Sequence, residues 1–285
     1  MNESEYVLGT GLTEAERLRI QARVWQEQAE GLLDVVGVQP GWRCVDIGCG
    51  AIGHLGLLSR RVGPDGRVVG VDIDPVLAAE ARAFAVEEGL RNVEVRVADM
   101  YDTGLPGGSF DLVHVRFVFC VVSGDPRQLR DELLRLARPG GIVLIEEPDL
   151  SSWNCSPPIP AWQRLKDVLT EAFRRDHCEL SFGSNVFGFL RDSGVEDMKA
   201  RAAAVAVQDD SPYMRTLLTF VELARHRIRG HQLMSDAEVD AALEECRRHL
   251  ANPGTIVVMP LLLQVWGRKP SPEDSSLAQA RAEGA

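Results

Sequence analysis

The stretch VDIGCGAIG, residues 45–53, decides the fold of this 285-residue chain. The apolar run from Arg43 to Ile47 has the composition of a buried β-strand, and residues 53–62 have that of a helix. Glycines between them, among them Gly48 and Gly50, let the backbone turn tightly and approach a ligand more closely than any Cβ would allow. The sequence therefore predicts a strand, a tight turn and a helix whose free N-terminal N–H groups face a ligand.

Asp46 distinguishes this turn from other glycine-rich turns. The spacing G-x-G-x-x-G has low specificity because many dinucleotide-binding proteins share it. A carboxylate two residues before the first glycine would repel the phosphates of a pyrophosphate. It suits a ligand that carries an ammonium or a sulfonium group.

Four further apolar runs follow, and polar residues stand at the ends of three of them. The runs span residues 67–71, 93–97, 110–115 and 142–145. Asp72 ends the first of these, where a carboxylate can accept both hydroxyls of a ribose. Asp99 follows the second and offers an acceptor to an adenine amino group, and Arg116 ends the third.

Helical patterns separate the runs. They span residues 53–62, 75–88 and 126–137. Such alternation implies right-handed crossovers and a parallel sheet covered on both faces. Ligands of these sheets bind beyond the carboxyl ends of the strands. Asp46, Asp72, Asp99 and Arg116 all fall at or near those ends, so we expect them to converge on one crevice.

The runs in this order, with Arg138-Pro139-Gly140-Gly141 before the last, resemble the class I S-adenosylmethionine-dependent methyltransferases. The resemblance is strong over about residues 40–150 and weaker beyond. One departure is the third glycine, because Ile52 precedes Gly53 where many members read D-x-G-x-G-x-G. The resemblance implies an α/β fold with a doubly wound, mainly parallel, seven-stranded Rossmann-like sheet. It also implies S-adenosyl-L-methionine as the cofactor.

Roles for several residues follow from the resemblance. It implies that Asp46 lies near the amino-acid part of the cofactor, often through water. It places Ile73 and Met100 on the two sides of the adenine. Arg116 faces either the methionine end of the cofactor or the surface. Residues 40–150 are thus expected to form the cofactor-binding core.

Residues 1–39 are expected to form an N-terminal helical lid. Tyr6 and Gln21 belong to a pattern similar to Y-x-L…E-x-x-R-L-x-x-Q, a signature of a methyltransferase subgroup in which this segment folds over the cofactor. A capping box at Thr13 predicts one helix that runs to about Leu33. The alternative is a surface helix with solvated charges.

After Glu147 the pattern changes. Helices are predicted at residues 160–175, 181–192, 212–229 and 235–250, and strands at 198–207 and 256–266. This order looks like the antiparallel pair that closes the methyltransferase sheet, with inserted helices as a cap over the crevice. We therefore assign residues 151–267 to a helical cap with closing strands, and residues 268–285 to a polar, disordered tail.

Candidate catalytic and substrate-binding residues lie in this second half. His177 stands in a short polar break between two cap helices, where a general base is expected. Glu147, or its neighbour Glu146, ends the fifth strand beside the crevice and could orient a substrate hydroxyl or amine. Trp153 and Tyr213 are the aromatic residues nearest the strand ends, and we expect them in the pocket. Each has a structural alternative, solvation for the histidine and core packing for the aromatics.

Composition limits the partners. Lys and Arg number 31 and Asp and Glu 42, so the net charge is −11, which argues against a nucleic-acid substrate. The six cysteines show no C-x-x-C and no histidine at metal-like spacing, so no metal is expected and a reducing cytoplasm fits best. Without a signal sequence or an 18-residue apolar run, we expect no membrane attachment. Monomer and homodimer stay open.

These features together predict a methyltransferase that moves a methyl group to O, N or C of a small molecule, mainly by proximity and orientation. The Arg/Ala/Gly-rich composition is typical of a high-GC bacterium, where such enzymes often modify secondary metabolites. One alternative is a methyltransferase acting on protein or RNA, although residues 115–118 lack the N-P-P-Y type motif often used on planar amines. The other is a nicotinamide-binding oxidoreductase, which Asp46 and Asp99 disfavour.

Overall fold

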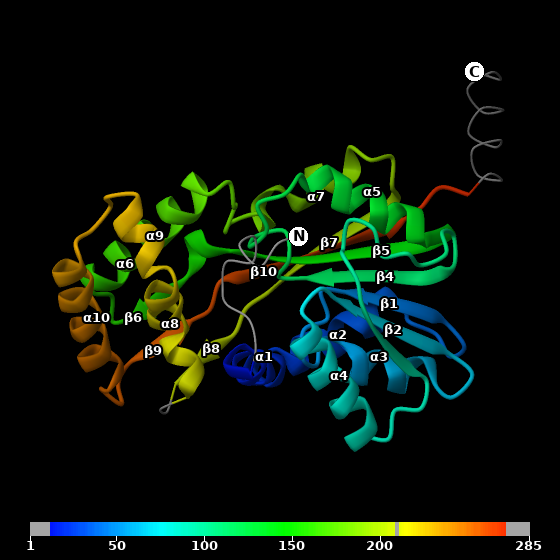
Figure 1. The fold of residues 1–285 in the computed structure, drawn as a ribbon, viewed down its shortest axis with the longest axis horizontal. Coiled ribbons are helices and arrows are strands. Elements are labelled where there is room, and N and C mark those ends of the chain that lie inside the picture. The colour runs from blue at the N-terminus through cyan, green and yellow to red at the C-terminus, as the bar shows by residue number, and fades with distance from the viewer. Residues whose placement is uncertain (1–11, 209–210, 272–285) are drawn as a thin grey trace.

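A seven-stranded sheet forms the centre of the molecule (Figure 1). The computed structural model describes residues 12–208 and 211–271. In sheet order, the strands are β3 (Val93–Val97), β2 (Arg67–Asp72), β1 (Arg43–Ile47), β4 (Phe110–Arg116), β5 (Ala137–Asp149), β10 (Leu261–Arg268) and β7 (Glu196–Ala203). The strands β1 to β5 pair in parallel, whereas β10 runs antiparallel to both β5 and β7. The predicted doubly wound, mainly parallel, seven-stranded sheet is confirmed.

Helices cover both faces of this sheet (Figure 1). On one face lie α5 (Pro126–Leu136) and α7 (Gly183–Arg191), and on the other α2 (Gln26–Val36), α3 (Leu55–Val62) and α4 (Pro75–Glu87). Successive side chains of a strand point to opposite faces. Val45 and Ile47 accordingly belong to the core beneath α5, and Cys44 to the core beneath α2 and α3. By the same alternation, the side chain of Asp46 points to the face of the sheet that α3 covers.

The second half of the chain builds a cap at one end of the sheet (Figure 1). Its helices are α6 (Pro160–Arg175), α8 (Thr216–Leu223), α9 (Arg225–Gly230) and α10 (Asp236–Leu250). Beside them lies a small sheet of β6 (Asn154–Ser156), β9 (Ile256–Val258) and β8 (Ala206–Val207). At the start of α10, where the helix was predicted to begin, Ser235 and Glu238 form a capping box. The buried cap side chains and those beneath α5 belong to one continuous apolar core.

Three elements predicted as single pieces are divided. The N-terminal helix is α1 (Leu12–Val24) followed by α2, with a break at Trp25, which is buried and has φ −98° and ψ 8°. The predicted strand 256–266 is β9 and β10, because Pro260 between them has no N–H to donate to a ladder. The predicted helix 212–229 is a 3₁₀ turn (Pro212–Arg215) followed by α8 and α9.

Strand boundaries near the cap also differ from the prediction. The strand expected at 198–207 ends at Ala203, and β8 then joins the small sheet instead of the large one. Pro148 does not end β5, which continues to Asp149 and pairs with β10 from Ile142 to Asp149. At the other end, Lys269 exchanges backbone hydrogen bonds with Gly140 and Gly141, so the predicted tail begins in contact with the sheet. No helix of the described ranges is long and apolar enough to cross a membrane.

Candidate functional site

A crevice lies beyond the carboxyl ends of β1, β2 and β4 and continues beneath the cap. Its sheet half, as we name it, is lined by Gly48, Gly50, Asp72, Ile73, Leu77 and Met100. Its cap half is lined by Leu150, Trp153, Phe173, Leu180, Phe220 and Met259. From α1, Leu18 and Gln21 reach the same space, and Arg116 lines it from the end of β4. The predicted convergence of strand-end residues on one crevice is therefore seen for Asp46, Asp72 and Arg116.

The glycine turn after β1 leaves no room for side chains. Gly48 and Gly53 have φ values of +67° and +50°, which residues with a Cβ rarely adopt. A Cβ on Gly48 would stand 2.6 Å from Val118 Cγ2, and one on Gly53 would stand 2.3 Å from Asp46 Oδ2. Gly53 is therefore required where it stands, although it is displaced from the usual spacing. The helix that follows begins at Leu55, two residues later than predicted.

Asp72 is one of the acidic residues that line the sheet half. Its Oδ2 accepts a hydrogen bond from Gly50 N at 2.7 Å, and its Oδ1 accepts one from Asp74 N at 2.9 Å. Burial raises the pKa of Asp72 to about 6, and these backbone bonds oppose the rise. A carboxylate has about four acceptor positions, so two remain for a ligand. Asp74 itself caps α4 by accepting a hydrogen bond from Val76 N.

Asp46 is tied into a buried cluster of charges. Its Oδ1 lies 2.7 Å from His114 Nδ1, and its Oδ2 accepts a hydrogen bond from His54 N at 2.7 Å. On the other side of His114, Nε2 lies 2.9 Å from Glu146 Oε1. Gln264 Nε2 of β10 donates to Glu146 Oε2 at 2.6 Å. The cluster thus joins four neighbouring strands, β1, β4, β5 and β10, and the start of α3 beneath the glycine turn.

Protonation of this cluster is set by burial and by its neighbours. Burial lowers the pKa of His114, but Asp46 and Glu146 outweigh it and raise the pKa to about 9. His114 is therefore a cation between two carboxylates. His54 has the opposite balance, because burial and the charge of His114 lower its pKa to about 4. The neutral His54 ring lies 4.1 Å from the His114 ring, centroid to centroid.

The aspartate and histidine side chains of this cluster are also of the types that bind metal ions. Asp46, His54 and His114 offer ligand atoms that all lie within 4.8 Å of one another. Two ligands on one tetrahedral metal with bonds of about 2.1 Å stand roughly 3.4 Å apart. Asp46 Oδ1 and His114 Nδ1 are closer than this, at 2.7 Å, which is the distance of a hydrogen bond. In this arrangement the two atoms share a proton and do not bind a common metal ion.

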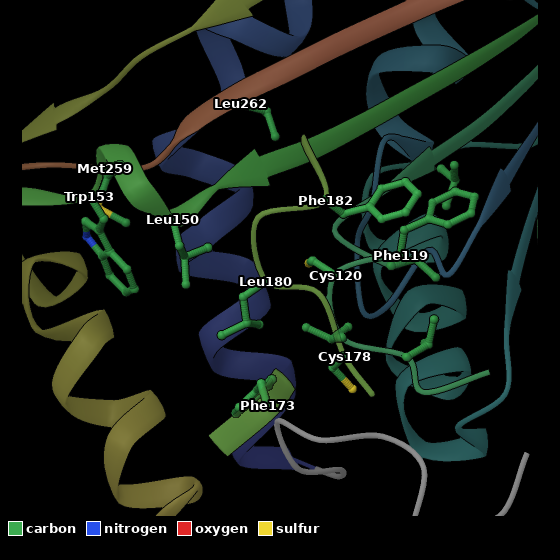
Figure 2. Close-up of a cluster of buried hydrophobic side chains, with 14 of the residues drawn as sticks. Phe119, Cys120, Leu150, Trp153, Phe173, Cys178, Leu180, Phe182, Met259 and Leu262 are labelled. Atoms are coloured by element: carbon green, nitrogen blue, oxygen red, sulfur yellow. The ribbon is translucent and has the colours of Figure 1, made fainter. Parts of the chain in front are cut away.

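The cap half is apolar, with a few hydrogen-bond donors. Figure 2 shows Met259, Trp153, Leu150, Leu180 and Phe173 following one another, although they come from separate segments of the cap and its connections. Trp153 packs edge-on against Trp162 and Phe220. Tyr213, nearly buried, accepts a hydrogen bond from the Trp25 indole at 3.2 Å. This bond connects the break between α1 and α2 with the cap.

Two arginines stand where the halves meet. On α1, Arg17 binds Glu14 and Gln21 and lies 5.2 Å over the Phe220 ring. Burial raises the pKa of Tyr213, and the positive charges of Arg17 and Arg116 oppose the rise. No carboxylate of the described residues forms an ion pair with Arg116.

Residues 45–145 match the family model for a methyltransferase domain. Over these residues the chain is similar to methyltransferase domains, and its fold is that of solved S-adenosylmethionine-dependent methyltransferases. A SAM-dependent methyltransferase from Aquifex aeolicus has the same fold, with a TM-score of 0.52, 23% identity and coverage of 69% of this chain and 91% of that one. A geranyl diphosphate C-methyltransferase from Streptomyces coelicolor A3(2) has a TM-score of 0.51 at 20% identity and covers 92% and 88%.

Curated relatives are similar in sequence to parts of this chain. The nocamycin O-methyltransferase of Saccharothrix syringae is 36% identical over 187 residues, which are 64% of this chain and 65% of the relative. Aklanonic acid methyltransferase DauC of Streptomyces sp. (strain C5) is 39% identical over 95 residues, 33% of this chain and 43% of the relative. The chain thus spans less than two thirds of the length of each.

The sheet half fits the cofactor of the methyltransferase family. Glycine backbone replaces side chains where a ligand must approach, and Asp72 has unused acceptor positions for ribose hydroxyls. Ile73 and Met100 line the crevice at the place expected for an adenine. Asp99 is not among the lining residues, although its neighbours Ala98 and Met100 are, and its carboxylate accepts a bond from Tyr101 N at 2.9 Å. The adenine contact expected for Asp99 stays a prediction.

Glu147 is not placed for catalysis. It alternates with Glu146 along β5 and faces the opposite side of the sheet, fully buried. Its carboxylate accepts three backbone N–H bonds, from Val118, Phe119 and Cys120, at 2.8 to 3.1 Å. It therefore holds the loop after β4, which lines the crevice, and does not line the crevice itself. This geometry favours a structural role, and the catalytic role of Glu147 stays an untested prediction.

His177 is also misplaced for a general base. The chain leaves α6 through His177 with φ +63°, and its side chain is exposed. It is not among the residues that line the crevice. Trp153, Tyr213 and Gln21 do line it, as expected for substrate or cofactor contacts. Tyr6 lies outside the described residues.

The sequence analysis missed His114 and His54. His114 interrupts an otherwise apolar strand, and a polar residue inside a buried parallel strand requires a partner. Its register opposite Asp46 on β1 was not visible from the sequence. His54 gave no signal, because a histidine at the start of a helix is common on surfaces.

Proposed function

We propose that this protein transfers a methyl group from S-adenosylmethionine to a small apolar molecule, with a bacterial secondary metabolite as the acceptor class. The observation that carries the proposal is the single crevice whose sheet half fits the cofactor and whose cap half is lined by aromatic and aliphatic side chains. Pockets for small molecules have this composition, mostly apolar with a few polar groups that fix orientation.

Bound S-adenosylmethionine supplies an activated methyl group on a sulfonium. The protein's part is then to hold the acceptor atom in line with it, and such alignment can contribute about 7–11 kcal/mol. Asp72 and the glycine turn fix the cofactor end. The cap side chains exclude water and position the acceptor. A strong general base is needed only for an acceptor that must lose a proton.

The relatives' names agree with a small acceptor, since one is named for O-methylation of nocamycin and another for aklanonic acid. A protein or RNA acceptor fits less well. The net charge of −11 opposes binding to RNA phosphates. A crevice partly roofed by α1 and the cap also offers little space for a macromolecule.

We further propose that residues 1–39 act as the lid and residues 151–267 as the cap of a core at residues 40–150. The lid is supported by Leu18 and Gln21 of α1, which line the crevice. Deleting residues 1–12 should lower cofactor affinity and turnover while the sheet domain stays folded. Full turnover by the truncated protein would remove the lid from the proposal.

Calorimetry tests the cofactor first. We expect micromolar binding of S-adenosylhomocysteine and no binding of NAD. Incubation with methyl-labelled cofactor and a natural-product library should then label a small molecule, and mass spectrometry should locate the methyl group. Binding of NAD without S-adenosylhomocysteine would overturn the proposal, as would labelling confined to RNA or protein.

A further inference from the structure

The polar groups of the cap half are donors. Trp153 is 1% exposed, and its indole Nε1–H has no hydrogen-bond partner among the described residues. Tyr213 already accepts a bond from Trp25, and burial raises its pKa, so its own hydroxyl hydrogen is available to donate. A buried donor without a partner costs about 1–3 kcal/mol. A ligand with acceptor oxygens would remove this cost.

A positive charge lines the same crevice as these donors. It is Arg116, at the end of β4, and its charge opposes the rise in the pKa of Tyr213. Its guanidinium lies 5.5 Å from the Phe117 ring centroid, and no carboxylate of the described residues neutralises it. A guanidinium binds carboxylates through two parallel hydrogen bonds, and these bonds are stronger where water is excluded.

Among the described residues, the cap half of the crevice has no general base. The ionisable acceptors that line the crevice, namely Asp46, His54, Asp72 and Asp74, all belong to the sheet half. Asp46 is occupied by His114 and His54, and His54 is neutral with a pKa near 4, which makes it a weak base. The carboxylates of Glu146 and Glu147 are buried and bonded elsewhere. An acceptor that must first lose a proton therefore finds no side-chain base among the described residues of the cap half.

We infer that the acceptor is an oxyanion, a carboxylate or a comparably acidic enol, carried on an apolar skeleton and bound by Arg116, Trp153 and Tyr213. This inference rests on the proposed methyltransferase function and names its substrate class. The aromatic side chains of the cap half contact the skeleton, and the donors bind the oxygen that does not react.

No proton moves in this reaction. One oxygen of the anion forms a bond to the methyl carbon while the bond from that carbon to sulfur breaks, and sulfur keeps the electron pair. The products are an ester or enol ether and S-adenosylhomocysteine. The negative charge of the acceptor and the positive charge of the sulfonium are both lost, so Arg116 binds the reactant more strongly than the neutral product. This difference favours product release.

Three probes with one skeleton test the inference: 2-naphthoate, 2-naphthol and 2-naphthylamine. Calorimetry at pH 7 with saturating S-adenosylhomocysteine should show 2-naphthoate binding at least tenfold more tightly than the two neutral probes. Arg116→Gln should reduce the affinity for 2-naphthoate about tenfold and leave that for 2-naphthol unchanged. Trp153→Phe, which removes the N–H, should weaken binding of 2-naphthoate severalfold.

Arg215→Gln is the matched control. It removes the same charge two residues after Tyr213, from an exposed side chain that does not line the crevice, and should leave all three affinities unchanged. Equal or weaker binding of 2-naphthoate would overturn the inference. So would an Arg116→Gln variant that loses affinity for S-adenosylhomocysteine but keeps its preference for 2-naphthoate, because Arg116 would then serve the cofactor. Failure of S-adenosylhomocysteine to bind the unmodified protein would instead overturn the proposed function.

Discussion

Replacing His114 with glutamine removes the cation between two buried carboxylates. Its ring nitrogens lie 2.7 Å from Asp46 Oδ1 and 2.9 Å from Glu146 Oε1, and all three side chains are at most 3% exposed. Removing one partner of a buried ion pair costs about 3–5 kcal/mol, because the remaining charge keeps its desolvation cost. We expect the free energy of unfolding of His114→Gln to fall by about this amount at pH 7.

The pH dependence gives a sharper signature. Burial lowers and the two carboxylates raise the pKa of His114, from 6.5 to about 9. A difference of this size corresponds to about 3 kcal/mol. Because the folded-state pKa is the higher one, this stability is fully present below pH 6.5 and is lost as the pH rises through 9. The unmodified protein should therefore lose about 3 kcal/mol toward pH 10, a loss that His114→Gln lacks.

Urea denaturation followed by circular dichroism from pH 6 to pH 10, at constant ionic strength, measures both effects. His226→Gln is the matched control, because His226 is exposed on α9 and should leave the stability unchanged. An unchanged urea midpoint for His114→Gln at pH 7 would refute the account of the buried cluster. The same alkaline loss in His114→Gln as in the unmodified protein would refute the assignment of that loss to His114.

Three further changes test the crevice. Asp72→Ala should weaken S-adenosylhomocysteine binding at least tenfold by calorimetry, since hydrogen bonds to a charged group are worth about 1.5–3 kcal/mol each; an unchanged affinity would remove Asp72 from the site. Glu147→Gln turns one acceptor oxygen into a donor facing a backbone N–H, so chemical denaturation should show a loss of about 1–3 kcal/mol, and equal stability would contradict the loop-holding role. Gly48→Ala adds a methyl group 2.6 Å from a neighbouring side chain and should reduce both stability, by about 1–3 kcal/mol, and cofactor affinity. Gly63→Ala, with a φ of +67° and open space around it, should lose stability through backbone strain but keep cofactor affinity, so an equal loss of affinity in both variants would contradict the role of the Gly48 contact.

Local chemistry made the sheet half predictable. The turn glycines, the carboxylate at the end of β2 and the Asp74–Pro75 start of α4 each depend on residues within a few positions of one another. The same holds for α6, predicted at residues 160–175 and found there, and for the capping box of α10. Cap, turn and periodicity rules use short-range contacts, so one sequence is enough for them.

Residues whose role depends on distant partners were not predictable in the same way. Glu146 and Glu147 are neighbours at the end of one strand, and only the register of β5 decides which of them meets His114 and which holds a loop. The position of His177 in a polar break does not show which way its side chain points, and in the structure that side chain is exposed. The division of the last strand depends on a second sheet, in which β9 pairs with β6, about a hundred residues earlier, and with β8, about fifty residues earlier.

The distribution of apolar clusters has a consequence for how the crevice opens. The cap shares its core with the face of the sheet beneath α5, so raising the cap would expose that core and unfold more than the cap alone. The first half of α1 belongs to a separate small cluster of Ala15, Ala51 and Leu77, whereas its last turn is anchored beside Trp25. Segments with few buried apolar contacts open at the lowest free energy. We therefore expect ligands to enter when the start of α1 lifts about Trp25, while the cap stays in place.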